Sequence, residues 1–436
     1  MLDARTDTRR SAGRGRAVEV AGAAALGGAV ASAAVLAAGA AGARQRYFVP
    51  SSRNAFPDWL AGPLHPLGVA LEPRTGALLL LALLGCWLAV VATARTLPAR
   101  LVWGAVIAAH VALLLAPPLF SADLFGYVGY ARLFAVHGID PYLHGASAAP
   151  LDPVRPFVGW HGIATPYGPL FTVASTPLAA VSVPVALWAC KLLAAAGSLL
   201  CVWLVARLAR ARGADVATAV AFFGLNPLLL AYEVGGGHND TLPVALVLVA
   251  LLLAAERRPA GAGASAALAA GVKASSALAL PFVLLAAPRR WRALVGAAAG
   301  IALTAAVGLA AFGTSTLAVG RQLRQQQQFV AHNSVPRRVA ELLGFDHLPD
   351  GLRLAAGALF AVAVALLLLA VWRRRLDALA GLGWATLALL LASAWMVPWY
   401  AVWLLPLAAV ARSPALAAAT VLLCAWLLAM QVHWLL

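Results

Sequence analysis

The sequence predicts an all-helical protein, a polytopic bundle that crosses a membrane about 11–13 times. Hydrophobic residues make up 63% of its 436 residues and charged residues only 11%, whereas soluble domains have about 45–50% and about 25%. Apolar stretches of about 20 residues, the length that crosses a membrane, recur along the whole chain. So few charged side chains cannot cover a soluble surface, which excludes a soluble enzyme, a nucleic-acid-binding domain and a disordered chain.

The apolar stretches are separated by arginine clusters and by polar loops rich in proline and glycine. After a basic tail over 1–16, residues 17–436 are expected to form one transmembrane domain with large outer loops at 120–167 and 313–351. Residues 168–206 fit one interfacial helix over 168–182 and one crossing over 185–206. The stretch 261–287 is expected to be two short helices that meet at Lys273. The predicted membrane segments are 17–43, 76–94, 101–119, 185–206, 214–232, 239–255, 261–287, 293–312, 352–372, 378–395, 399–411 and 414–434.

The distribution of basic residues predicts the orientation. With the N-terminus inside, nineteen arginines fall on the cytoplasmic side and eleven outside, among them Arg44, Arg46 and Arg53. Cytoplasmic loops of membrane proteins carry this excess of basic residues. The net charge of +16 therefore indicates orientation and contact with anionic membrane lipids, and no nucleic-acid partner. Two lysines lie within membrane segments; Lys191 is expected to snorkel from an outer span end.

Acids and histidines gather on the predicted outer face, where ATP and nucleotide sugars are absent. Asp123 follows an apolar span directly, so it should lie partly desolvated at the membrane boundary, which suits a general base. The alternative is that Asp123 N-caps a short amphipathic helix after it. The same loop supplies further polar candidates for a substrate site, namely Tyr127, Arg132, His137, Asp140 and Tyr142.

Two turns at the outer ends of spans add more candidates. The first, Thr165-Pro166-Tyr167-Gly168-Pro169, presents Tyr167 at the interface, either as a substrate contact or as a membrane anchor. The second brings three glycines together with Glu233, His238, Asn239 and Asp240. Asn239 or Asp240 could simply cap the next helix. His238 and Asp240 could give two metal ligands, but without a third this is a weak metal signal, so we expect no cofactor.

Three further features bear on the site. Lys273, between two short apolar helices, needs an anion, a carbonyl or a cavity. Arg337 and Arg338 beside the membrane suit either a phosphate or lipid headgroups. The segment Trp395-Met396-Val397-Pro398-Trp399-Tyr400 is typical of an aromatic belt, and could also line a lipid or sugar groove. The run Gln325 to Gln328 is assigned no chemistry.

Taken together, these motifs resemble the GT-C superfamily of polytopic glycosyltransferases, closest to the actinobacterial polyprenol-phosphate-mannose-dependent alpha-1,6-mannosyltransferases. The stretches that carry the resemblance are 123–142, 165–170, 226–240, 271–281 and 397–405. The resemblance implies that Asp123 matches the catalytic carboxylate, that 236–240 borders the sugar site, and that Lys273 matches the family's membrane lysine.

The expected function is an inverting transfer of a sugar, most simply mannose, from a polyprenyl-phosphate donor to an envelope glycolipid or glycan on the extracytoplasmic face. Asp123 would act as the general base, and Lys273, Arg337 and Arg338 would surround the leaving phosphate, with His238 as a further candidate. The alternatives are a lipid or lipid-linked-sugar transporter and a non-catalytic assembly partner. No internal repeat is evident, and the polarity is one-sided, unlike that of a transporter.

Overall fold

The computed structural model describes residues 2–43, 49 and 57–435, and within these ranges it is all-helical, with helix in 77% of residues and no strand. This confirms the predicted fold class. The side chains of 2–14, 43, 434 and 435 are not described, and Arg44, Arg46 and Arg53, assigned to the outer side, lie outside the described residues. The long helices are α1 (Leu2–Ala43), α3 (Pro73–Thr93), α7 (Val183–Ala211), α12 (Arg290–Phe312), α15 (Asp350–Trp372) and α18 (Pro414–Leu435).

Six helical segments of the described chain are long and apolar enough to cross a membrane, so the protein is a multi-pass membrane protein. They are Gly15–Gly42, Pro73–Thr96, Val183–Ala211, Arg290–Gln326, Asp350–Trp372 and Pro414–His433. The remaining α-helices are α2 (Asp58–Ala61), α4 (Ala99–Leu114), α5 (Asp123–Ala135), α6 (Pro169–Ala174), α8 (Val216–Gly224), α9 (Thr241–Ala255), α10 (Pro259–Val272), α11 (Ala279–Ala286), α13 (Val319–Gln326), α14 (Val335–Leu342), α16 (Ala378–Ala392) and α17 (Ala401–Val410).

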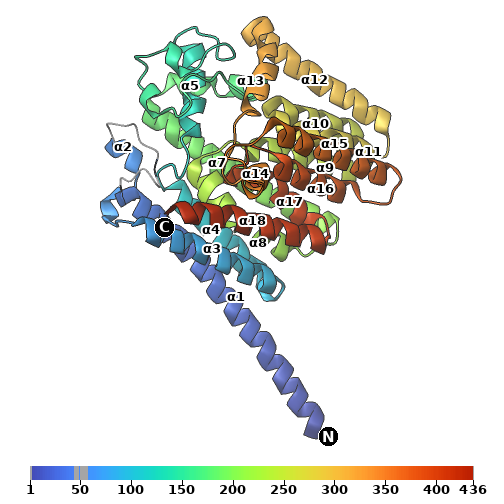
Figure 1. Cartoon of the computed structure of the whole chain (residues 1–436). Helices are drawn as coiled ribbons and strands as arrows, with labels where there is room; N and C mark the ends of the chain where they lie inside the picture. Colours follow the sequence, from blue (N-terminus) through green and yellow to red (C-terminus); the bar gives the residue numbers. More distant parts are fainter. Residues whose placement is uncertain (1, 44–48, 50–56, 436) are drawn as a thin grey trace.

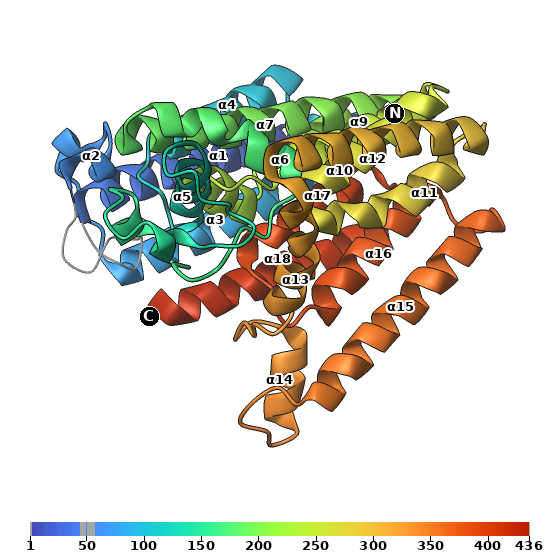
Figure 2. The same cartoon turned by 90° about the horizontal axis from the view of Figure 1, so that it is seen from above.

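The helices pack side by side into one bundle, from which α1 extends (Figure 1). Helix α1 reaches well beyond its neighbours toward the N-terminus, so the basic tail is helical rather than extended. Helix α15 lies along the edge of the bundle, and only 6% of its apolar window is buried (Figure 2). An apolar helix that packs so little against protein has a surface suited to lipid.

Short helices interrupt the bundle at one end, and these interruptions build the site. A π-helix, η6 (Leu229–Val234), separates α8 from α9, and the 3₁₀ helix η7 (Ala274–Leu278) separates α10 from α11. The break at Lys273 confirms the prediction of two short helices within 261–287. Gly168 makes this junction possible, because a Cβ at Gly168 would lie 2.0 Å from the Gly271 carbonyl oxygen. The Gly168 N–H donates to the Val272 carbonyl at 3.0 Å, which places Tyr167 beside Lys273.

The two large loops carry the remaining helical turns. The first contains α5, as the amphipathic pattern predicted, followed by η3 (Ala146–Ala148) and η4 (Arg155–Phe157). The second contains η8 (Gly313–Ala318), α13 and α14. Between the first loop and α7 lie α6 and η5 (Thr176–Ala180), which confirms that 168–182 is helical and separate from the span that follows. The other short turns are η1 (His65–Leu67), η2 (Ala94–Thr96) and η9 (Pro398–Tyr400).

Candidate active site

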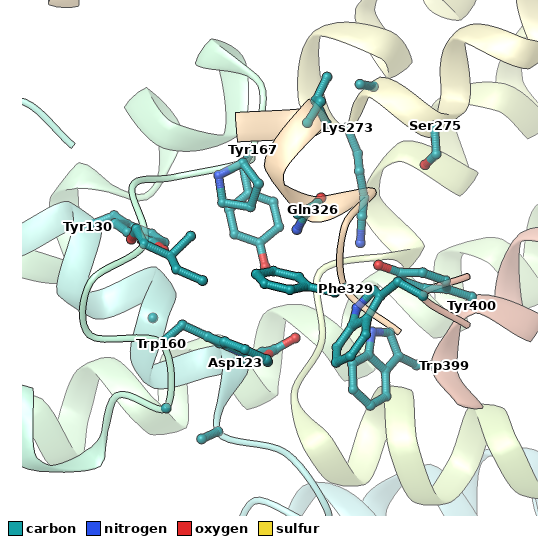
Figure 3. Close-up of a pocket in the computed structure, with 18 of the residues that line it drawn as sticks. Asp123, Tyr130, Trp160, Tyr167, Lys273, Ser275, Gln326, Phe329, Trp399 and Tyr400 are labelled. Carbon is teal, nitrogen blue, oxygen red and sulfur yellow. The ribbon is translucent and has the colours of Figure 1, made fainter. Parts of the chain in front are cut away.

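A cavity of about 150 Å³ lies where the first loop meets the interrupted helices. Its polar lining includes Asp123 from the start of α5, and Lys273 from the break between α10 and η7. Both side chains point into the same space, between aromatic rings contributed by the loops (Figure 3). The rings that line it are those of Tyr130, Trp160, Tyr167, Phe329, Trp395, Trp399, Tyr400 and Trp403. A carboxylate and an ammonium therefore face a mostly aromatic space that is partly closed to water.

Asp123 is the carboxylate of this cavity, and its side chain is 20% exposed. It does not cap helix α5: Ala122 stands at the N-cap position, and the Asp123 N–H donates to the Ser121 hydroxyl oxygen at 3.1 Å. The alternative interpretation of Asp123 as a helix cap is therefore wrong. Among the described residues its ion-pair partner is His238, whose Nε2 lies 3.7 Å from Asp123 Oδ2. The carboxylate is thus left available to a substrate.

His238 stands behind Asp123 in a fixed orientation. Its Nδ1 lies 2.7 Å from the Tyr232 carbonyl oxygen, so it carries a proton and donates. Its ring stacks on Trp399, with centroids 4.0 Å apart and planes at 22°. The Nε2 atom is buried and has no hydrogen-bond partner among the described residues. The ring is therefore held on two sides, and its one unsatisfied atom faces Asp123.

Lys273 makes the second polar centre of the cavity. Its Nζ lies 2.6 Å from Asp240 Oδ1, which also accepts from Trp403 Nε1 at 2.6 Å. The ammonium lies over three rings at 5.3–5.8 Å from their centroids, those of Tyr167, Tyr400 and Trp403. Rings at this distance attract a cation. The lysine side chain is nevertheless 15% exposed, so it remains accessible from the cavity.

Asp240 is free to hold Lys273 because another acid caps the helix. Neither Asn239 nor Asp240 caps α9 through its side chain, contrary to the simpler expectation. Instead Glu233 Oε1 accepts from the Thr241 N–H at 2.8 Å. Asn239 Oδ1 lies 3.5 Å from the Tyr127 hydroxyl, which donates to it. Thus Glu233, Asn239 and Tyr127 support the cavity without lining it.

The other candidates of the first loop hold that loop together. Asp152 accepts from Arg132 Nε at 2.9 Å and lies 2.7 Å from His137 Nε2. Burial alone would raise the pKa of Asp152, but the hydrogen bonds from His137, the Val154 N–H and Arg132 outweigh it and lower the pKa below its usual value. Arg132 and His137 therefore have a partner within the loop.

Asp140 and Tyr142 tie the loop to its surroundings. Asp140 Oδ1 accepts from the Tyr142 N–H at 2.8 Å, and its other oxygen accepts from the Ser315 hydroxyl of η8. The Tyr142 hydroxyl donates to the Tyr167 carbonyl at 3.0 Å. Burial raises the pKa of Tyr142 to about 12, so this tyrosine stays protonated as a donor. These contacts fix the position of the turn that carries Tyr167.

Arg337 and Arg338 do not line the cavity. Both lie on α14 and pair with one acid: Arg337 Nε is 3.1 Å and Arg338 Nη1 2.7 Å from the Glu341 carboxylate. Of the predicted site residues, the structure brings Asp123, Tyr167 and Lys273 to the cavity surface and places His238 and Asp240 in contact with them.

Sequence reasoning missed several lining residues. Gln326 and Phe329 line the cavity from the end of α13 and the segment after it, although the glutamine run was assigned no chemistry. Trp160, Ser275 and Trp403 were also missed. The aromatic segment 395–400 lines the cavity, which supports the groove alternative over a simple belt. A run of amides next to a membrane span was the one available signal for Gln326.

Among the described residues, no group of three or more His, Cys, Asp or Glu side chains could hold a metal ion. The fold and the site together define a class: a multi-pass membrane protein with one aromatic cavity at the end of its bundle, where a carboxylate faces a lysine. The family follows from comparison with known proteins.

Residues 25–289 match the family model of the alpha-(1->6)-mannopyranosyltransferase N-terminal domain, and residues 340–432 match the MptB C-terminal domain. The first match alone covers more than half of the chain, so the chain belongs to the alpha-(1->6)-mannopyranosyltransferase family. This confirms the resemblance stated from the motifs. No solved structure matches the chain.

Two relatives illustrate the similarity. The chain is 35% identical over 179 residues to alpha-(1->6)-mannopyranosyltransferase A of Corynebacterium glutamicum, covering 40% of this chain and 36% of the relative. It is 30% identical over 319 residues to alpha-(1->6)-mannopyranosyltransferase A of Mycobacterium tuberculosis, covering 66% of this chain and 61% of the relative. The matches therefore span less than two-thirds of the length of these relatives.

Proposed function

We propose that the chain is a mannosyltransferase that moves mannose from a polyprenyl-phosphate donor to a hydroxyl of an envelope glycolipid or glycan. The observation that carries the proposal is the pair Asp123 and Lys273, which face one aromatic cavity from separate elements. Family membership supports mannose as the sugar, because the curated relatives are named alpha-(1->6)-mannopyranosyltransferases. A lipid-linked donor suits a cavity built at the end of membrane helices.

The reaction is a single displacement. Asp123 takes the proton of the acceptor hydroxyl, and that oxygen forms a bond to the anomeric carbon of the donor sugar. The bond between the anomeric carbon and the phosphate oxygen breaks, and polyprenyl phosphate leaves with the electron pair. One base and a good leaving group on opposite faces of the sugar give inversion, by the logic of inverting glycosidases.

Lys273 is the cation we assign to the leaving phosphate. Charge builds on the phosphate oxygen as the bond breaks, and a preorganised cation stabilises it. Asp240 and the three surrounding rings hold the ammonium in place before substrate arrives. Arg337 and Arg338 remain predicted phosphate contacts, but Glu341 already neutralises part of their charge.

The aromatic lining suits the sugar. Pyranose rings present apolar C–H faces, and flat aromatic side chains offer large rigid surfaces for them. Trp160 and Trp399 lie on either side of Asp123 in the cavity (Figure 3). His238 keeps Trp399 in place by stacking against it. The sugar would thus lie between indole rings with its anomeric carbon near the carboxylate.

We propose that this cavity opens on the extracytoplasmic face, as the arginine distribution predicts. Ala148 is exposed on the first large loop and offers a direct test. A cysteine introduced there should react with an impermeant maleimide in whole cells. Labelling only after lysis would show that this loop is cytoplasmic and would contradict a donor site on the extracytoplasmic face.

The catalytic proposal is tested with the purified full-length chain, radiolabelled polyprenyl-phosphate mannose and a membrane lipid extract as acceptor. Asp123→Asn keeps the shape of the side chain but removes its basicity, so transfer should fall by about 10²–10⁴-fold. Asp346→Asn is the matched control, because Asp346 is an exposed acid of the second large loop that does not line the cavity. If Asp123→Asn transfers within a few-fold of wild type, Asp123 is not the general base and the catalytic proposal fails.

A further inference from the structure

A second cavity, of about 540 Å³, lies at the opposite end of the bundle from the aromatic one. Helix α9 shows the separation: it starts at Thr241, beside Asp240, and its last turn supplies Leu251, Ala254 and Ala255 to this second cavity. Fifteen residues of α-helix correspond to roughly 20 Å. The second cavity therefore belongs to neither the carboxylate nor the lysine of the proposed active site.

The walls and the rim of this cavity differ in character. Leu208, Leu251 and Leu285 line it from the last turns of α7, α9 and α11, so its walls are apolar. Its rim carries three arginines and one acid from the segment after α15 and the loop after α7. Figure 2 shows the ends of α11 and α15 at this side of the bundle. A cleft of this size with apolar walls and a charged rim fits an amphiphile, since ligand cavities measure about 300–1,000 Å³.

The charges on the rim do not cancel. Arg212 pairs with Asp377, with Nη2 and Oδ2 2.8 Å apart, and donates through Nε to the Val410 carbonyl at 3.1 Å. Arg374 and Arg375 make no ion pair or side-chain hydrogen bond within the part of the chain that the structure describes, and both are exposed. The rim thus keeps two positive charges above an apolar space.

We propose that this cavity binds one anionic phospholipid of the inner leaflet, with its phosphate on Arg374 and Arg375 and acyl chains against the leucines. Basic pockets between membrane helices on the cytoplasmic side bind anionic headgroups. Helix ends with arginines after them occur elsewhere on this side, and there the arginine can simply offset the helix dipole. What distinguishes Arg374 and Arg375 is the apolar cavity beneath them.

The bound lipid would also join α15 to the bundle. Helix α15 buries little surface of its own, and its final turn supplies Val371 to the cavity beside residues of α7, α9 and α11. A lipid between these helix ends would stabilise their packing. The ligand class follows from the charge and the apolar walls alone and does not depend on the proposed transfer reaction.

The test is native mass spectrometry of the full-length protein titrated with phosphatidylglycerol or phosphatidylcholine. Arg374→Gln/Arg375→Gln should weaken phosphatidylglycerol binding by about fivefold for each arginine lost, since each basic residue near a lipid surface contributes about 1 kcal/mol. The matched control is Arg257→Gln/Arg258→Gln. Arg257 follows a helix end with the same φ of 58° as Arg374, and both control residues are exposed but do not line the cavity.

The proposal holds if phosphatidylglycerol binds more tightly than phosphatidylcholine and only the Arg374/Arg375 variant loses this preference. If both variants lost this preference equally, general surface charge would explain it, and the proposal would be overturned. The proposal would also be overturned if neither variant lost the preference. A competition with glycerol phosphate tests the apolar walls: displacement at the same concentration as the phospholipid would show that acyl chains contribute nothing and would overturn a lipid site.

Discussion

Two lysines lie inside the bundle, and their different hydrogen-bond partners indicate different roles for the two side chains. Lys191 on α7 is fully buried, and its Nζ donates to the carbonyls of Gly235 at 2.7 Å and Leu113 at 3.0 Å, with those of Pro117 and Val234 at 3.5 Å. Lys273 instead pairs with Asp240, lies among aromatic rings and lines a cavity. The expectation that Lys191 snorkels to the surface is wrong, because backbone carbonyls surround its ammonium within the protein.

The contrast separates a structural cation from a functional one. Lys191 is surrounded by acceptors on chain segments that must come together to form the site, so it holds the backbone of the site in place. Lys273 keeps exposure toward the cavity, so it has hydrogen-bonding capacity left for a ligand. The carboxylates divide in the same way: Asp152 is enclosed by donors within its loop, whereas Asp123 faces open space.

The largest expected effect is on stability at the structural lysine. Lys191→Met removes the donor shared by buried carbonyls, and each buried group left without a partner costs about 1–3 kcal/mol. We expect the free energy of unfolding to fall by about 3 kcal/mol or more, measured by thermal or denaturant unfolding of the purified protein. Leu192→Ala, at the next and exposed position of α7, is the control and should change little. If Lys191→Met were as stable as wild type, Lys191 would not be the structural cation proposed here.

The second prediction concerns the functional lysine. Lys273→Gln loses the charge but keeps an amide donor for Asp240, so the variant should still fold, although less stably because Asp240 stays buried without a cation. Donor binding should weaken by about 10–100-fold, because a hydrogen bond to a charged group contributes about 1.5–3 kcal/mol. Binding of polyprenyl-phosphate mannose to the purified variant is the measurement.

A double variant controls for the buried acid. Lys273→Gln/Asp240→Asn removes both charges, so no unpaired buried carboxylate remains. If donor binding returned in the double variant, Lys273 would serve only to neutralise Asp240, and the phosphate would have to bind elsewhere.

The third prediction uses the carboxylate that the loop encloses. Because the pKa of Asp152 is lowered in the folded protein, its contribution to stability is full above the usual aspartate pKa, near 3.8. It is lost as the pH falls through the lowered value. Proteolysis of the first loop should therefore accelerate below about pH 4. In Asp152→Asn the loop should already be less stable at pH 7 by about 1–3 kcal/mol. Its rate of proteolysis should also change less as the pH falls. An unchanged acid response in Asp152→Asn would assign the effect to another group.

The sequence predicted the helical fold and the break at Lys273, because apolar length and isolated charges are local signals. It could not predict that Glu233 caps α9 and so leaves Asp240 to Lys273, since the cap acts across eight positions of irregular chain. Trp160 and Phe329 stack on each other from two different loops, with ring centroids 5.3 Å apart, and such tertiary contacts leave no local pattern. The sequence also could not predict that Arg337 and Arg338 share one partner, the carboxylate of Glu341.

The smallest expected effect is at that arginine pair. Arg337→Gln/Arg338→Gln should weaken donor binding by only about twofold to fivefold, because partly exposed ion pairs contribute about 0–1 kcal/mol and Glu341 already holds both guanidinium groups. The measurement is the same donor-binding assay as for Lys273→Gln. A loss of donor binding as large as that of Lys273→Gln would mean that the donor phosphate binds beside α14.

The central claim is that one cavity binds a lipid-phosphate sugar through Lys273 and reacts through Asp123. The most direct measurement is the shift in melting temperature that polyprenyl-phosphate mannose causes in wild type, Asp123→Asn and Lys273→Gln, since a ligand that binds only the folded state stabilises it. Wild type and Asp123→Asn should be stabilised equally, while Lys273→Gln should require at least about tenfold more donor for the same shift. Equal stabilisation of all three proteins, or none in wild type, would contradict it.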